Sequence, residues 1–187
     1  MISQQAELDA VNEILSSTGD TPVNTLENLT DVNAINARSI LTRVNRQFQS
    51  RGWSFNYMES YTFNPDVYSK KILWNNDILY LEGTDKTKYI KKDEYIYDKT
   101  NSTNIFRSAI TADVIFLVPI EELPEQAMDY VVAKSCTEFA TRFLGDTDLI
   151  KILMNAEREA WSFFHEYEMD NNNYNMLENT DVQAVKG

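Results

Sequence analysis

The chain contains one histidine and one cysteine, the two side chain types that most often act as a base or a nucleophile near neutral pH. His165 follows Phe163 and Phe164, and the sequence has no Gly-x-Ser-x-Gly motif whose serine could pair with it. Cys136 falls on an apolar stripe at helical spacing, where an inert core thiol is the usual outcome. We therefore predict structural roles for both residues and no catalytic site.

Carboxylates are the remaining candidates for chemistry, because two of them flanking a sugar bond are enough for a glycosidase. The acidic residues include two dense groups, at Glu121, Glu122 and Glu125 and at Glu157, Glu159, Glu166 and Glu168. Such abundance produces pairs by chance, and a solvated acidic helix face explains the groups more simply. A carbohydrate-degrading enzyme that uses two of these carboxylates stays open as an alternative.

The composition argues against cofactors, metals and membranes. One cysteine leaves no thiol pair for a zinc site, and none of the five glycines stands in a phosphate-binding loop. No run of about 18 apolar residues and no signal-peptide pattern is present, so we expect no membrane span and a cytosolic site of synthesis. The 29 acidic and 17 basic residues give a net charge of −12, which disfavours specific nucleic-acid binding.

Apolar residues at helical spacing predict four helices that would position these side chains. Two lie before a strand-rich middle, over about residues 4–17 and 31–52, and two lie after it, over about 124–145 and from 146 or 148 to 170. Pro124 suits the first turn of the third helix, and Asp146 or Asp148 suits the N-cap of the fourth. Four helices of this kind could close a four-helix bundle.

The middle of the chain predicts antiparallel strands, because aromatic and β-branched residues recur there in short runs. The runs at 78–81 and 95–97 flank a lysine-bearing loop, as in a hairpin or meander, and 114–118 is apolar enough to be the most buried strand. The predicted class is α+β. It consists of a helical bundle at residues 1–52 and 119–170, a β-sheet insertion between the second and third helices at 53–118, and an extended C-terminal tail at 171–187.

Three arginines form the first candidate binding surface. Arg38, Arg43 and Arg46 follow one another along the second predicted helix of an otherwise acidic chain. They are either solvated and paired with acids of the same subunit or part of a partner-binding stripe. For the second case we predict an interface with a neighbouring subunit or another protein, since arginine pairs bidentately with carboxylates.

The C-terminal segment is the second candidate. It is polar after Asp170, yet it contains the apolar side chains of Tyr174, Met176 and Leu177. Such anchors bind a partner if something else buries them, and otherwise the segment is a frayed end. We predict a docking role for Tyr174, Asn175, Met176 and Leu177.

Five ordered blocks of the sequence resemble one protein family. They are 10–15 with Gly19, 22–23 and 25–27; 45–47 with 49–56; 65–69 with 95–98; 142–145; and 167–170 with 174–177. Over about residues 6–177 the chain resembles the tail tubular protein A family of T7-like podophages. The block at 45–56, where the second helix meets the sheet, is the most specific.

The resemblance implies a structural virion protein rather than an enzyme. It implies an adaptor ring, a dodecamer, that joins the portal protein to the tail nozzle, tail tubular protein B, and lets DNA pass through its lumen without specific binding. The implied location is the virion tail, after assembly in the host cytoplasm. On this basis Tyr174, Asn175, Met176 and Leu177 would bind the portal. A carbohydrate-degrading enzyme of the tail and a cytosolic helical interaction module are the alternatives.

Overall fold

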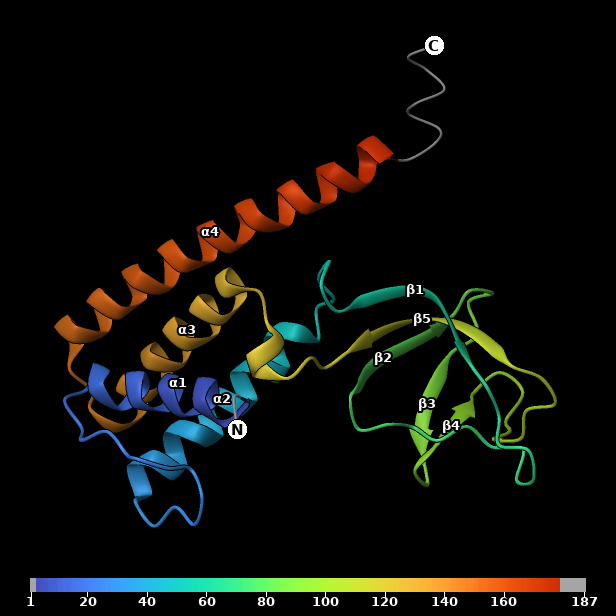
Figure 1. Ribbon diagram of the computed structural model, residues 1–187, viewed down its shortest axis with the longest axis horizontal. Coiled ribbons are helices and arrows are strands. Elements are labelled where there is room, and N and C mark those ends of the chain that lie inside the picture. The colour runs from blue at the N-terminus through green and yellow to red at the C-terminus, as the bar shows by residue number, and fades with distance from the viewer. Residues whose placement is uncertain (1–2, 179–187) are drawn as a thin grey trace. The chain divides into compact units, whose positions relative to one another are not determined.

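The computed structural model describes the backbone of residues 3–178 and the side chains of residues 5–171. It contains four α-helices, five β-strands and a short 3-10 helix (Figure 1). The helices are α1 (Ser3–Ser17), α2 (Val32–Gln49), η1 (Ile120–Glu122), α3 (Glu125–Phe143) and α4 (Thr147–Glu178). The strands are β1 (Tyr57–Phe63), β2 (Ile78–Gly83), β3 (Tyr89–Lys92), β4 (Tyr95–Asp98) and β5 (Ile110–Phe116). This arrangement confirms the predicted α+β class.

The chain divides into two compact units, one helical and one made of strands. Within the described part, the helical unit contains residues up to Phe48 and from Pro119 onward, and the strand unit contains Gln49–Val118. The strand unit is thus an insertion between α2 and α3, and it begins four residues before the predicted boundary at 53.

The helical unit is built on the pair α3 and α4, which lie side by side (Figure 1), and α1 packs against α3 and η1. Its core is apolar, and its largest fully buried side chains are Val11, Ile14, Leu15, Leu41, Val44, Val131, Phe139 and Phe164. Aromatic contacts connect the helices, because the Phe48 ring of α2 lies tilted against Tyr130 of α3 at 5.3 Å and edge-on to Phe164 of α4 at 4.9 Å between ring centroids. Burial of one apolar stripe on each helix therefore holds the unit together.

Local hydrogen bonds fix where the helices begin. The Asp31 side chain accepts a bond from the Ala34 N–H at 2.9 Å, and the Asp146 side chain accepts bonds from the N–H groups of Asp148 and Leu149 at 2.9 and 3.1 Å. Asp146 and Asp148 are the two predicted N-caps of the fourth helix, and these bonds show that Asp146 is the N-cap. Pro124 precedes the third helix as its N-cap residue, and Gly145 follows it with φ +72°.

The fourth helix continues further than predicted. Its backbone is helical to Glu178, whereas the sequence predicted an end near Asp170 and an extended tail from residue 171. The asparagines at 171–173 are weak helix formers but not helix breakers, and no proline or glycine follows until residue 187. Once a helix is nucleated, each added residue gains a hydrogen bond, so weak propensity alone does not end it.

The strand unit contains a three-stranded antiparallel sheet in the order β1-β5-β2 and a hairpin of β3 and β4. β5 is the central strand, and Ala112 and Val114 on it are fully buried, which agrees with the strong apolar character of this run. β4 pairs with β3 rather than with β2, and Lys88, the residue before β3, forms an isolated bridge with Glu82 of β2. The two sheets share one core, made of Ile72, Ile78, Leu81, Ile96, Phe106, Ala112 and Val114.

Two buried amides tie the start of the strand unit to its end. Gln49 donates to the Val118 carbonyl at 2.9 Å and accepts from the Val118 N–H at 2.7 Å. Asn56 donates to the backbone carbonyls of Gln49 and Phe116 at 3.0 and 2.8 Å and accepts from the Trp53 N–H at 2.8 Å. Both side chains are almost completely buried, so these bonds satisfy groups that water cannot reach. This network joins the residues that follow α2 to the residues that follow β5.

Candidate interface surfaces

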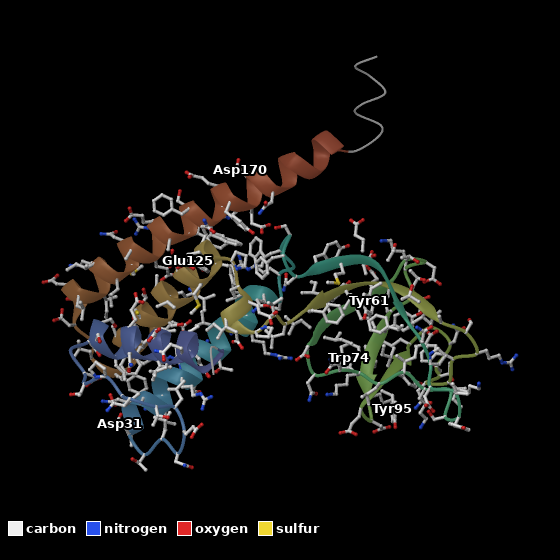
Figure 2. All side chains as sticks on the ribbon, in the orientation of Figure 1. Asp31, Tyr61, Trp74, Tyr95, Glu125 and Asp170 are labelled. Carbon is white, nitrogen blue, oxygen red and sulfur yellow. The ribbon has the colours of Figure 1, made fainter. Side chains whose placement is uncertain are left out.

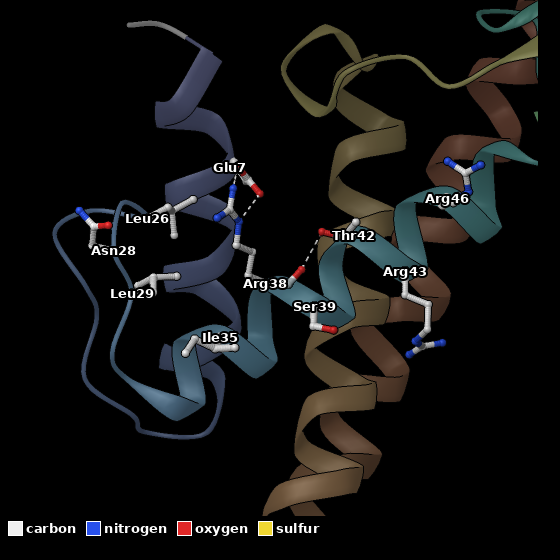
Figure 3. A pocket seen from close by; sticks show the side chains of 10 residues that line it. All are labelled: Glu7, Leu26, Asn28, Leu29, Ile35, Arg38, Ser39, Thr42, Arg43 and Arg46. Atoms are coloured by element: carbon white, nitrogen blue, oxygen red, sulfur yellow. Dashed lines mark hydrogen bonds and ion pairs between the residues drawn. The ribbon is translucent and has the colours of Figure 1, made fainter. Parts of the chain in front are cut away.

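The three predicted interface arginines line one groove of the helical unit (Figure 3). The groove lies between α1, the connector that follows it and α2, and its volume is about 870 Å³. Its remaining lining residues are Glu7, Leu26, Asn28, Leu29, Ile35, Ser39 and Thr42. Helix α2 brings the arginines to this side because its other side buries Ala34, Ala37, Leu41 and Val44. We call it the arginine groove.

Two of the three arginines are paired within the subunit. Arg38 forms a bidentate pair with Glu7, with Nε–Oε1 at 2.8 Å and Nη2–Oε2 at 3.1 Å. The hydrogen bond to Glu7 raises the pKa of Arg38 above its usual value. Arg43 pairs with Glu138 of α3 and also donates to Gln47 at 3.2 Å. The sequence leaves two interpretations open, pairing within the subunit and a partner-binding stripe. The observed contacts of Arg38 and Arg43 agree with pairing within the subunit.

Arg46 differs from the other two. Its side chain is exposed, and it makes no hydrogen bond or ion pair with another residue of the described chain. Leu26, Leu29 and Ile35 form an apolar wall at the opposite end of the groove from Arg46 (Figure 3), and Ile35 is 45% exposed. A groove that combines an exposed apolar wall with an arginine has a composition common in protein interfaces.

The four predicted portal-binding residues, Tyr174, Asn175, Met176 and Leu177, belong to the last turns of α4 by their backbone. Their side chains lie outside the described residues, and so does the chain after Glu178. Their role stays a prediction.

A second groove of the helical unit is acidic. It lies between α1, η1 and α3, has a volume of about 460 Å³, and is lined by five carboxylates over an apolar floor. The carboxylates are Asp9, Glu13, Glu121, Glu125 and Asp129, and no basic residue lines it. We call it the acidic groove. The sequence contains a signal for this groove, because Asp9 and Glu13, and likewise Glu125 and Asp129, are four residues apart and therefore share a face of their helix.

The electrostatics of the acidic groove bear on the enzyme alternative. Partial desolvation, followed by the charge of Asp129, raises the pKa of Glu13, and partial desolvation, followed by the charge of Glu125, raises the pKa of Asp129. A glycosidase keeps one carboxyl protonated and its partner ionised, so the two pKa values must be driven apart. Here both are shifted in the same direction, which does not favour that chemistry.

The cysteine is buried in the helical core, whereas the histidine is exposed on α4 and contacts a neighbouring aromatic ring. The His165 ring stands edge-on to Trp161 at 4.4 Å between centroids. Burial raises the pKa of the Cys136 thiol to about 12, so it is not a thiolate at neutral pH. Among the described residues no cluster of three or more histidine, cysteine or acidic side chains is placed to hold a metal ion. None of the described helices has the length and apolar character needed to span a membrane.

A helical unit with two charged grooves and an inserted strand unit is the architecture of a protein that works through its surfaces. Residues 8–174 match the family model described as Tail tubular protein, and the chain belongs to this family. It is 31% identical over 154 residues to Tail tubular protein A of Klebsiella phage KP34, and the match covers 81% of each chain. The chain is therefore a structural protein of a bacteriophage virion tail.

Proposed function

We propose that the chain is the tail-tube adaptor, a homo-oligomeric ring of twelve copies that joins the portal protein to the tail nozzle, tail tubular protein B, and acts without catalysis. The observation that carries this proposal is the match to the Tail tubular protein family over most of the chain. Assembly takes place in the host cytoplasm, and the finished ring stays in the virion tail.

The distribution of charge supports a ring through which DNA passes without specific binding. Residues 49–118 contain nine basic and nine acidic side chains, so the whole excess of acid in the chain belongs to the helical unit. A helical unit with this charge repels phosphates instead of gripping them, which suits a passage along which DNA must slide.

Docking to the portal is assigned to Tyr174, Asn175, Met176 and Leu177. These residues combine apolar anchors with the end of α4, whose described residues Met169 and Asp170 are exposed. A weak contact of this kind gains strength by repetition around a ring. The second interface, towards a neighbouring subunit or the nozzle, is assigned to the arginine groove with Arg38, Arg43 and Arg46.

The test mixes the purified chain with assembled portal of the same phage. Native mass spectrometry measures the mass of the complex, and electron microscopy measures its symmetry. A ring of the chain seated on the portal is expected. A chain that stays monomeric beside the portal at concentrations well above those of assembly would contradict the adaptor role.

A further inference from the structure

The outer side of the β3–β4 hairpin is a basic and aromatic surface. Antiparallel pairing places Ile90 opposite Tyr97 and Lys92 opposite Tyr95, and the bridge Leu73↔Tyr95 adds the segment before β2 to the same side. Since side chains alternate along a strand, Lys71, Lys88 and Lys99 share this side, while Ile72 and Ile96 point into the core. We call it the lysine–tyrosine face; Figure 2 labels Tyr95 on it.

Two lysines of this face lie over tyrosine rings, and none of its four lysines is neutralised by an ion pair among the described residues. The Lys71 ammonium lies 4.8 Å from the centroid of the Tyr95 ring, and that of Lys92 lies 4.4 Å from the Tyr97 ring. Lys71, Lys88, Lys92 and Lys99 form no ion pair with any carboxylate of the described chain. The face thus presents four positive charges that have no acidic partner within the described part of the chain.

The same face exposes apolar surface. Leu73 is 62% exposed and Ile90 is 40% exposed, and both stand beside the tyrosines. Asp98, between Tyr97 and Lys99, is buried on the opposite side, where it accepts bonds from the N–H groups of Thr100 and Asn101. Aromatic and apolar side chains ringed by cations are the composition of an interface for an acidic surface with an apolar centre.

The acidic groove has the complementary composition. Its carboxylates surround a floor that includes Ala10, Leu123 and Met128, and no lysine or arginine lines it. Partial burial, and after it the charge of a neighbouring carboxylate, raises the pKa values of Glu13 and Asp129, so these carboxylates repel one another in the groove. An arriving cation would remove this repulsion.

We propose that the lysine–tyrosine face of one copy docks into the acidic groove of a second copy, head to tail. The occupant is a second copy because each surface carries the charge that the other lacks and both belong to one chain. An interface between two different surfaces of identical subunits closes into a ring when the rotation fits, so this inference rests on the proposed ring.

The experiment is a reciprocal charge swap in the full chain. The face variant carries Lys88→Glu and Lys92→Glu, the groove variant carries Glu13→Lys and Asp129→Lys, and a third chain carries all four changes. The control carries Lys86→Glu and Arg107→Glu, which change the charge of the strand unit equally at exposed positions outside the face. Sedimentation velocity and native mass spectrometry measure self-association in solution and on assembled portal, and circular dichroism checks that each variant is folded.

We expect the face and groove variants each to weaken association by about tenfold or more, as loss of close charge pairs does at other interfaces. The chain with all four substitutions should recover association, because its swapped charges again face opposite charges. An equimolar mixture of the face variant and the groove variant should recover association for the same reason. The control should associate as the unchanged chain does. Folded face and groove variants that assemble normally, or a fourfold variant that does not recover, would overturn the inference.

The outcomes separate this inference from the proposed function. If the unchanged chain forms no ring in solution or on the portal, the adaptor role fails and the docking model fails with it. If the unchanged chain forms rings and only the swap pattern is missing, the docking model alone is wrong. A filter-binding assay with a DNA duplex tests a third case. If the face variant forms normal rings but these rings retain less DNA than rings of the unchanged chain, the face binds phosphate, and the second copy is not its occupant.

Discussion

Gly52 is the residue at which backbone conformation and packing both demand glycine. Its φ is +76°, and a Cβ there would lie 2.8 Å from Cδ1 of Ile115. Gly19 has a similar φ of +83° but no atom within 4 Å of such a Cβ. The two glycines therefore separate the cost of a left-handed backbone from the cost of a steric contact.

We expect Gly19→Ala to lower the free energy of unfolding by about 1–2 kcal/mol, the cost of the left-handed conformation for a residue with a Cβ. Gly52→Ala should lose the same amount and about 1–3 kcal/mol more, because Ile115 must shift. Urea unfolding of both variants measures the difference. Equal losses would mean that Ile115 accommodates the methyl group freely.

Cys136 links stability to pH. Its pKa is raised by burial from 9.0 in the unfolded chain to about 12 in the folded protein, so the folded state retains the thiol proton while the unfolded state releases it. A raised folded pKa contributes stability that is complete below the unfolded pKa and is lost as pH rises. The free energy of unfolding should therefore fall between pH 9 and 12 by more in the unchanged chain than in Cys136→Ala. Parallel pH profiles of the urea midpoint would contradict this.

At the scale of elements, the end of α2 and the end of β5 are joined by the amides of Gln49 and Asn56. Gln49 satisfies both the N–H and the carbonyl of Val118, so Gln49→Leu would leave two buried backbone groups without partners. Each unsatisfied group costs about 1–3 kcal/mol, and for the two groups we expect a total loss of about 2–6 kcal/mol in the free energy of unfolding.

The matched control is Gln47→Leu, two residues away on the exposed side of α2, where a change within about 0.5 kcal/mol is expected. Chemical denaturation followed by circular dichroism compares the two variants. A Gln49→Leu protein as stable as Gln47→Leu would show that water or a backbone shift replaces the lost bonds.

At the scale of the whole molecule, portal binding is predicted to depend on the end of α4. A chain that stops at Asp170 retains the buried residues Phe164 and Glu168 of that helix, so its fold should survive. It should lose binding to assembled portal, because Tyr174, Asn175, Met176 and Leu177 are removed. Co-sedimentation with the portal measures this, and a folded truncated chain that binds normally would refute the assignment.

The arginine groove yields a prediction about assembly. Arg46→Glu should impair ring formation, since its exposed guanidinium has no partner among the described residues, while changing stability by no more than about 0.5 kcal/mol. Lys151→Glu, an exposed charge reversal on α4, is the control. Native mass spectrometry measures the fraction of each variant that is assembled into rings. Normal assembly of the Arg46 variant would place the interface elsewhere.

The sequence by itself determined what depends on neighbours along the chain. Helical periodicity, the caps at Asp31 and Asp146, the glycine after α3 and the short apolar strands are local patterns, because each is set by hydrogen bonds or side chain spacing within a few residues. The family blocks and the net charge were likewise readable without coordinates. These signals predicted the α+β class, the four helices and the inserted strands.

Only the tertiary structure decided which distant residues meet. Arg38 pairs with Glu7 across 31 positions and Arg43 with Glu138 across 95, and no local pattern selects one carboxylate among 29. The β1-β5-β2 order, the gathering of lysines on one hairpin face and the meeting of α1 and α3 carboxylates in one groove also result from packing. The physical reason is that local hydrogen bonds set each element, whereas burial of the shared core sets the partners of each element.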